Sequence, residues 1–159
     1  MKKKIAYLFG ILILSTLSSR AEVPTTSQEA LGMKIIASVQ SKNEASYMKL
    51  IHPKCLTAYE GLSVLSTEWK NMGQFEIPTS PEPQITITTS DDLSKFEEYY
   101  YSPAWPELKL TIRVEWKAEK GTKSVLLYRY IKQEEGIWYM SLQEDKGWED
   151  YLRKKGRIQ

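Results

Sequence analysis

A strict two-residue alternation between Leu108 and Lys117 constrains the fold of this chain more than any other pattern. Apolar side chains occupy the even positions from Leu108 to Trp116, and polar or charged side chains occupy the odd positions from Lys109 to Lys117. Successive side chains of a strand point to opposite faces, so this run predicts a long strand with one face against a core. Two further strands are predicted, over about residues 123–132 and 137–143.

The turns between these strands, Glu119-Lys120-Gly121 and Glu134-Glu135-Gly136, both place glycine third. A three-residue hairpin loop ends in a left-handed residue, which favours glycine there. Loops of three residues place Tyr128 opposite Ile112 and Tyr130 opposite Met140, and a slip of one residue would reverse the faces of the middle strand. The predicted core-facing set, which leaves Arg129 outside, is Leu110, Ile112, Val114, Trp116, Leu126, Tyr128, Tyr130, Trp138, Met140 and Leu142.

Helical spacing dominates the first half of the chain. A helix is predicted from a cap at Ser27 to about Ser41, and a second over 44–51, ended by Pro53. A third is predicted over about 62–73 with Gly73 as its stop. A short strand over 85–89 and an acidic helical turn over 91–98 follow. Helices first and strands later indicate one α+β domain over 22–159.

The first 21 residues have the pattern of a cleavable signal peptide. Three lysines precede an apolar core over 5–17, and Ser19-Arg20-Ala21 is a small-x-small cleavage signal. An uncleaved anchor would need about 20 apolar residues, and a lipoprotein would need a cysteine directly after the core, whereas the only cysteine is Cys55. The sequence therefore predicts a mature chain from Glu22, periplasmic or secreted, with no stable membrane anchor after cleavage.

Charge argues against nucleic acid as a partner. Cleavage after Ala21 removes four of the 22 basic residues and none of the 20 acidic ones, so the formal charge changes from +2 to −2. Nucleic-acid binding draws on a concentrated basic surface, which a near-neutral domain of this kind lacks overall.

The order of elements resembles the nuclear transport factor 2-like superfamily, a cystatin-like α+β cone. The residues that carry the resemblance are the opening helix, the helix end over 47–53 and the strand over 136–140. The resemblance implies a curved antiparallel sheet wrapped around the first helix, with a pocket whose use varies among members. Enzymes of that superfamily hold an aspartate, glutamate or histidine in the cone as general base, beside a tyrosine or acid.

No catalytic residue is predicted, because the predicted core-facing positions of the three long strands contain no carboxylate and no histidine. The alternative is a small isomerase- or hydratase-like pocket enzyme that uses Tyr128 or Tyr130 with a loop carboxylate. That reading requires Glu68, Asp91 or Asp92 to reach the cavity.

His52 and Cys55 form a His-x-x-Cys pair that falls short of a metal site or a thiol nucleophile. A structural zinc site needs four ligands, and a cysteine nucleophile needs a histidine held by a third group. The pattern favours a helix-end histidine beside a packed cysteine, with an intermolecular disulfide as the alternative. No metal site and no cofactor is predicted.

Aromatic and proline residues crowd between positions 99 and 106. Tyrosine and tryptophan offer large contact area at low entropic cost, so the segment is either a contact surface or a loop that covers the open end of the sheet. The candidate ligand or partner site, with Tyr128 and Tyr130 added from the sheet, is Tyr99, Tyr100, Tyr101, Trp105, Tyr128 and Tyr130.

These observations predict an exported small binding or accessory domain, whose partner is an envelope protein or a small ligand. A self-associating subunit is the other alternative. That homodimer would use a second apolar face formed by Val125, Leu127, Ile131 and Tyr139.

Overall fold

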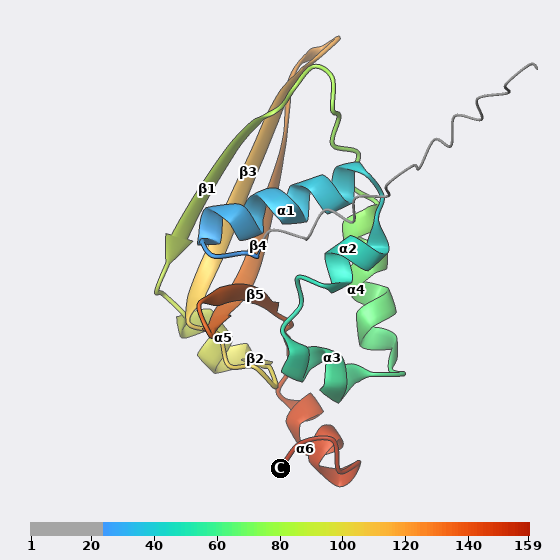
Figure 1. Ribbon diagram of the computed structural model, residues 1–159, viewed down its shortest axis with the longest axis vertical. Helices are drawn as coiled ribbons and strands as arrows, with labels where there is room; N and C mark the ends of the chain where they lie inside the picture. The colour runs from blue at the N-terminus through green and yellow to red at the C-terminus, as the bar shows by residue number, and fades with distance from the viewer. Residues whose placement is uncertain (1–23) are drawn as a thin grey trace, which may run out of the picture.

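Helix α1 lies across one face of a long, curved antiparallel sheet in the computed structural model (Figure 1). The structure describes residues 24–159, so the predicted signal peptide over 1–21 lies outside the described residues. In the part that is described, no helix is both long and apolar enough to cross a membrane. The architecture is α+β, as the sequence predicts, with helices packed against the sheet.

The four-stranded sheet has the order β1-β3-β4-β5, and a separate two-stranded sheet pairs β2 with β6. The helices are α1 Gln28–Gln40, α2 Glu44–Met48, α3 Pro53–Tyr59, α4 Ser63–Gly73, α5 Ser94–Tyr99 and α6 Gly147–Lys154. The strands are β1 Gln84–Ser90, β2 Tyr100–Tyr101, β3 Leu108–Ala118, β4 Gly121–Glu134, β5 Ile137–Ser141 and β6 Glu144–Asp145.

Helix α1 forms where the sequence predicts it. The Ser27 Oγ accepts a hydrogen bond from the Ala30 N–H at 3.0 Å, which caps the first turn. The residues at helical spacing, Leu31, Ile35, Ile36 and Val39, are all buried. This apolar stripe holds the helix on the sheet.

The prediction that Pro53 ends the second helix is incomplete, because Pro53 begins another helix. Helix α2 already ends at Met48, and Pro53 is the first residue of the unpredicted helix α3. Proline suits this position because the first N–H groups of a helix have no partner within it. The His52 Nδ1 caps α3 by accepting from the Lys54 N–H at 3.1 Å.

The outer edge of β5 is covered by two segments from the first half of the chain. The Met140 N–H donates to Leu50 O at 2.7 Å, and the His52 N–H donates to Met140 O at 2.8 Å. Further along, the Trp138 N–H donates to Thr25 O at 2.8 Å. Pairing of this kind protects a strand edge that would otherwise be open to other chains.

The predicted register of β4 is wrong by one residue at both turns. Ala118 pairs with Gly121, and Glu134 pairs with Ile137, so each loop has two residues. Ile112 therefore lies opposite Leu127, and Met140 lies opposite Ile131.

The second turn shows why the loop is shorter than predicted. Glu135 has φ +51° and Gly136 has φ +79°, so both central residues are left-handed, as a two-residue type I′ turn requires. Glutamate rarely takes this conformation. Glu134 belongs to the strand, so Gly136, the third residue of the Glu134-Glu135-Gly136 motif, is the second residue of the loop.

The slip exchanges the two faces of β4. Leu127 and Ile131 are buried on the face that α1 and α4 cover, here called the inner face, whereas Leu126 and Tyr128 lie exposed on the opposite, outer face. The prediction that Leu126 and Tyr128 belong to the core is wrong. The second apolar face proposed for self-association is also wrong, because its Leu127 and Ile131 are core residues.

Arg129 also changes sides, from the predicted exterior to the inner face. Its guanidinium contacts Glu68 of α4 and Tyr47 of α2. The predictions for the flanking strands hold, since Leu110, Ile112 and Met140 are fully buried. The inner face is thus an apolar surface with one arginine in it.

Candidate functional site

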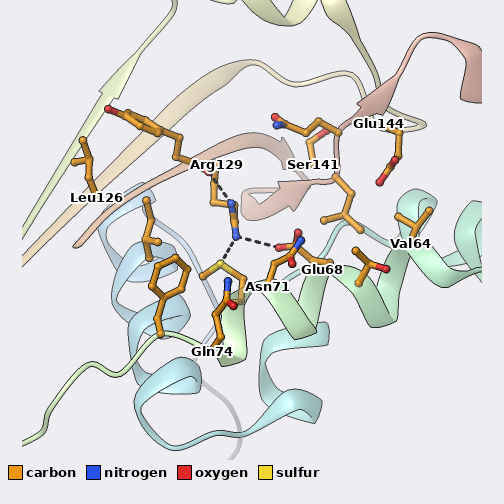
Figure 2. Close-up of a pocket in the computed structure, with 15 residues that line it drawn as sticks. Val64, Glu68, Asn71, Gln74, Leu126, Arg129, Ser141 and Glu144 are labelled. Atoms are coloured by element: carbon orange, nitrogen blue, oxygen red, sulfur yellow. Dashed lines mark hydrogen bonds and ion pairs between the residues drawn. The ribbon is translucent and has the colours of Figure 1, made fainter. Parts of the chain in front are cut away.

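A cavity of about 450 Å³ lies between helix α4 and the inner side of β4, in the range of small-molecule sites (Figure 2). Helix α4 contributes Glu68, Asn71 and Gln74, and the sheet contributes Arg129. The segment after β5 closes the cavity with Gln143 and Glu144 among others. Most of its polar groups are therefore amides and carboxylates.

Arg129 and Glu68, which both line this cavity, form a connected group with Tyr47 of α2. The Arg129 Nη2 lies 3.1 Å from Glu68 Oε1 and 3.3 Å from the Tyr47 hydroxyl. The Tyr47 hydroxyl donates a short hydrogen bond to Glu68 Oε1, and Arg129 Nη2 also contacts Met72 Sδ. Figure 2 shows Arg129 and Glu68 turned toward each other.

The three side chains of this group are largely buried, so their contacts bear on stability. The side chains of Arg129 and Glu68 are each 20% exposed, and Tyr47 is fully buried. Burial raises the pKa of Tyr47, against the lowering effect of Arg129. The tyrosine therefore stays neutral and acts as a hydrogen-bond donor, and Glu68 Oε1 lies between two donors, the Tyr47 hydroxyl and Arg129 Nη2.

Arg129 keeps one donor unused. Its Nη1 donates to the Tyr128 carbonyl at 2.8 Å, while its Nε is buried and has no hydrogen-bond partner among residues 24–159. A buried N–H without an acceptor costs about 1 to 3 kcal/mol. A ligand atom that accepts this hydrogen bond would recover part of that energy.

Glu144 is the second carboxyl group of the cavity. Burial raises its pKa, and the nearby charges of Asp145 and Glu68 add to the effect. Across the described part of the chain, no hydrogen bond or ion pair engages its side chain. Glu144 therefore offers an acceptor to a cation or a hydrogen-bond donor placed in the cavity.

The predicted aromatic site is largely assembled, on the outer face and around Phe96. The Phe96 ring centroid lies 4.8 Å from that of Tyr130 and 5.0 Å from that of Trp105. Tyr100 lies 6.4 Å from Tyr130, and Tyr99 lies 6.5 Å from Tyr100. These rings cover the end of the sheet at Phe96, which is fully buried.

Tyr128 continues this surface along β4, and Tyr101 does not. Tyr128 is on the same face of the strand as Tyr130, and the Lys109 Nζ lies 4.7 Å from its ring centroid. Tyr101 instead pairs with Glu144 in the small sheet and packs against the main core. Five of the six predicted site residues thus share one surface.

Of the three predicted acids, Glu68 reaches the cavity. Its partners are Tyr47 and Arg129. Tyr128 also lines the cavity, but within residues 24–159 no hydrogen bond joins Glu68 to Tyr128 or Tyr130. Asp92 lies at the outer end of the sheet, where its carboxylate accepts hydrogen bonds from Ser94.

His52 and Cys55 are both buried, at the N-cap and in the first turn of α3. His52 is fully buried, and its Nε2 lies 3.2 Å from Glu134 Oε2 at an angle that makes no hydrogen bond. Burial lowers the pKa of His52, and the opposing effect of Glu134 is smaller. Cys55 is a buried free thiol whose Sγ lies 3.4 Å from Ser102 Oγ. Within 24–159, no cluster of three or more histidine, cysteine, aspartate or glutamate side chains could hold a metal ion.

Sequence reasoning missed Arg129 and Glu144 as cavity residues, and Tyr47 as a partner of Arg129. Arg129 is the only charged residue between Val125 and Ile131, and a lone charge within an otherwise apolar strand is the signal that could have identified it. Glu144 begins β6, three residues after the end of β5, and carries no comparable signal.

Comparison with known protein families, with curated proteins and with solved structures finds no match to this chain. The geometry of the cavity is therefore the basis on which a function can be inferred.

Proposed function

We propose that this chain is an exported, nuclear transport factor 2-like binding domain that holds a small polar ligand in the cavity between α4 and β4. The observation that carries the proposal is a pair of unused polar groups in that cavity. Among residues 24–159, the buried Nε donor of Arg129 has no acceptor and the Glu144 carboxyl group has no donor, and both residues line the cavity.

The two groups define the ligand class. The charge of Glu68 is already compensated by Arg129 at 3.1 Å, so Glu144 leaves the cavity with an uncompensated acid whenever it is ionised. A ligand that fits both groups carries an acceptor for Arg129 and an ammonium or hydroxyl donor for Glu144. Small amino-carboxylate compounds have this combination, and the amides of Asn71, Gln74 and Gln143 can complement either end.

An enzyme that transfers a proton is the second candidate. The raised pKa of Glu144 favours it, because a carboxyl group titrating nearer neutrality is a better general acid or base. Binding is the stronger proposal, since the Glu68 carboxylate is already engaged by Tyr47 and Arg129 and is not free to act as the second acid or base.

The test is a matched series of ω-amino acids of increasing length, with the corresponding amines and carboxylic acids as single-function probes. A ligand that binds the folded state raises the melting temperature by mass action. We expect an amino acid of one length to raise it more than its amine or its acid does, and Glu144→Gln to abolish that difference.

Glu119→Gln, in the exposed turn before β4, is the matched control and should behave as the wild type. The binding proposal fails if no member of the series stabilises the protein, or if Glu144→Gln responds as the wild type does.

A further inference from the structure

The two edges of the four-stranded sheet differ in how they are covered. Strand β5 forms one edge, and Thr25, Leu50 and His52 border it through backbone hydrogen bonds. Strand β1 forms the other edge and is the outermost strand of the sheet (Figure 1). Among residues 24–159, no backbone hydrogen bond reaches β1 from any segment other than β3. The outward N–H and C=O groups of β1 can therefore pair with another strand.

Strand β1 also lacks the features that usually protect a sheet edge. Over Gln84–Ser90 it has no charged residue and no proline, and it pairs with β3 residue by residue without a bulge. Five of its seven residues are isoleucine or threonine, which favour extended backbone. A regular, uncharged edge of this length suits the addition of an extended peptide as a further strand.

The side chains of β1 define the pattern of such a strand. Ile85 and Ile87 lie opposite Val114 and Ile112 on the inner face, and both isoleucines are partly buried against the core. Thr86 lies between them on the outer face and is exposed. An added strand presents its side chains alternately to the same two faces. Apolar residues on its inner side and polar residues on its outer side would therefore extend both faces of the sheet.

Acidic residues lie beyond both ends of β1. The segment 71–94 holds four acidic residues and no basic one. Glu82 comes two residues before the strand, and Asp91 follows it directly. Both are exposed, and within residues 24–159 neither makes an ion pair. A partner strand with lysine or arginine near each of its ends would complement these charges.

The same charges argue against a second copy of this chain as the added strand. Full antiparallel overlap of two β1 strands would pair residue 84 of one copy with residue 90 of the other, and so would bring Glu82 toward Asp92 at both ends. Like charges that face each other across strands are destabilising. We propose that β1 instead receives an extended segment of a different protein, in which alternating apolar and polar residues lie between basic ends.

Strand addition at β1 would leave the cavity between α4 and β4 free, because none of residues 76–94 lines that cavity. Glu144→Gln, the variant that tests ligand binding in the cavity, should therefore leave strand addition unchanged. The two proposals can fail independently of each other.

The probe is a synthetic peptide with seven alternating valine and threonine residues, the length of β1, between two lysines at each end. Its counterpart carries glutamates in place of the lysines. Fluorescence anisotropy measures the binding of each labelled peptide to the protein. We expect the lysine-ended peptide to bind at least about tenfold more tightly than the glutamate-ended peptide.

Charge reversal on the protein should reverse this preference. Glu82→Lys/Asp91→Lys should bind the glutamate-ended peptide more tightly than the lysine-ended one. Glu135→Lys/Asp150→Lys is the matched control, because it changes the net charge equally at exposed positions outside β1 and its flanks, and it should bind as the wild type does. A thermal melt confirms that both double variants are folded.

Amide hydrogen exchange distinguishes strand addition from binding by charge alone. In an antiparallel edge strand, the N–H groups of alternate residues point away from the neighbouring strand. These alternate amides of β1 should exchange at least about tenfold more slowly when the lysine-ended peptide is bound. The remaining amides of β1, which bond to β3, should change little.

The proposal is overturned if the lysine-ended peptide does not bind, or if it binds and leaves the alternate amides of β1 unprotected. Equal binding of the two peptides would overturn the basic character assigned to the partner. Protection of the same amides that rises with protein concentration, without any peptide, would show that a second copy of this chain occupies the edge instead.

Discussion

The two faces of strand β4 reverse the usual distribution of side chains. The inner face, which helices cover, holds the charged Arg129 between the buried Leu127 and Ile131. The outer face, which is largely open, holds Leu126 and Tyr128, both about half exposed. An apolar sequence on both sides of a strand therefore does not mean that both sides are buried.

The two faces also differ in how much their side chains contribute to the stability of the fold. Arg129 is tolerated inside because Glu68 and Tyr47 bind it, at the cost of removing two charges from water. Leu126 and Tyr128 gain little from folding because they remain in water. Three predictions can break or sharpen this comparison.

The largest expected effect is the loss of the Ile131 side chain. Ile131→Ala should lower the free energy of unfolding by about 4 kcal/mol, as large-to-small changes in a core do. Leu126→Ala on the outer face should cost about 0.5 kcal/mol or less, as at other exposed positions. Urea denaturation of both variants measures the difference. If Leu126→Ala lowered the free energy of unfolding more than Ile131→Ala, the register predicted from three-residue loops would be correct instead.

Removal of the inner arginine should have the next largest effect. Arg129→Ala should cost about 2 to 3 kcal/mol, less than a wholly buried pair because both side chains keep some contact with water. Arg113→Ala, on the outer face, is the control and should cost less than about 0.5 kcal/mol.

A double variant separates the charge from the packing of Arg129. Arg129→Met/Glu68→Gln should recover most of the stability that Arg129→Ala loses, because no unpaired charge remains and the glutamine carbonyl still accepts from Tyr47. If the double variant is less stable than Arg129→Ala, the ion pair is not what holds the arginine inside.

The smallest effect concerns His52, beside the end of β4. Burial holds its folded-state pKa below the ordinary value of 6.5, so below pH 6.5 the unfolded chain takes up a proton that the folded chain resists. Stability should therefore fall as the pH drops below 6.5, at no more than about 1.4 kcal/mol per pH unit. Melting curves between neutral and mildly acidic pH measure this slope.

His52→Asn is the matched variant, because asparagine can still cap α3 but does not titrate. Glu134, Lys54 and Lys132 act on this site in both proteins, and Glu144, with its raised pKa, changes stability in the opposite direction. The difference between wild type and variant isolates the histidine, and parallel pH profiles would exclude its contribution.

The sequence predicts those elements whose pattern has one interpretation. Helix α1 has a single apolar stripe and a serine cap, and β3 alternates without a break, so both are predicted in place. Strand β4 is apolar on both faces, and its orientation depends on a turn in which Glu135 adopts a left-handed conformation that its residue type does not indicate. The error at that turn moves every side chain of the strand to the other face.

The same register error explains why the sequence does not predict the cavity. Arg129 enters the cavity only in the observed register, and Tyr47 and Glu68 meet it from two different helices. The aromatic residues from Tyr99 to Trp105 are close together in the sequence. The sequence alone therefore identifies them, but it does not place them on the sheet.

Because Thr25 pairs with Trp138, 113 positions later, the first part of this domain to be synthesised is among the last to find its partner. A nascent chain that has not yet reached Ile137 leaves Thr25 and the segment from Leu50 to His52 without the strand that they border in the finished molecule. Contacts between such distant positions form slowly. The domain therefore closes only after β5 has been synthesised, when the strand that both segments border is present.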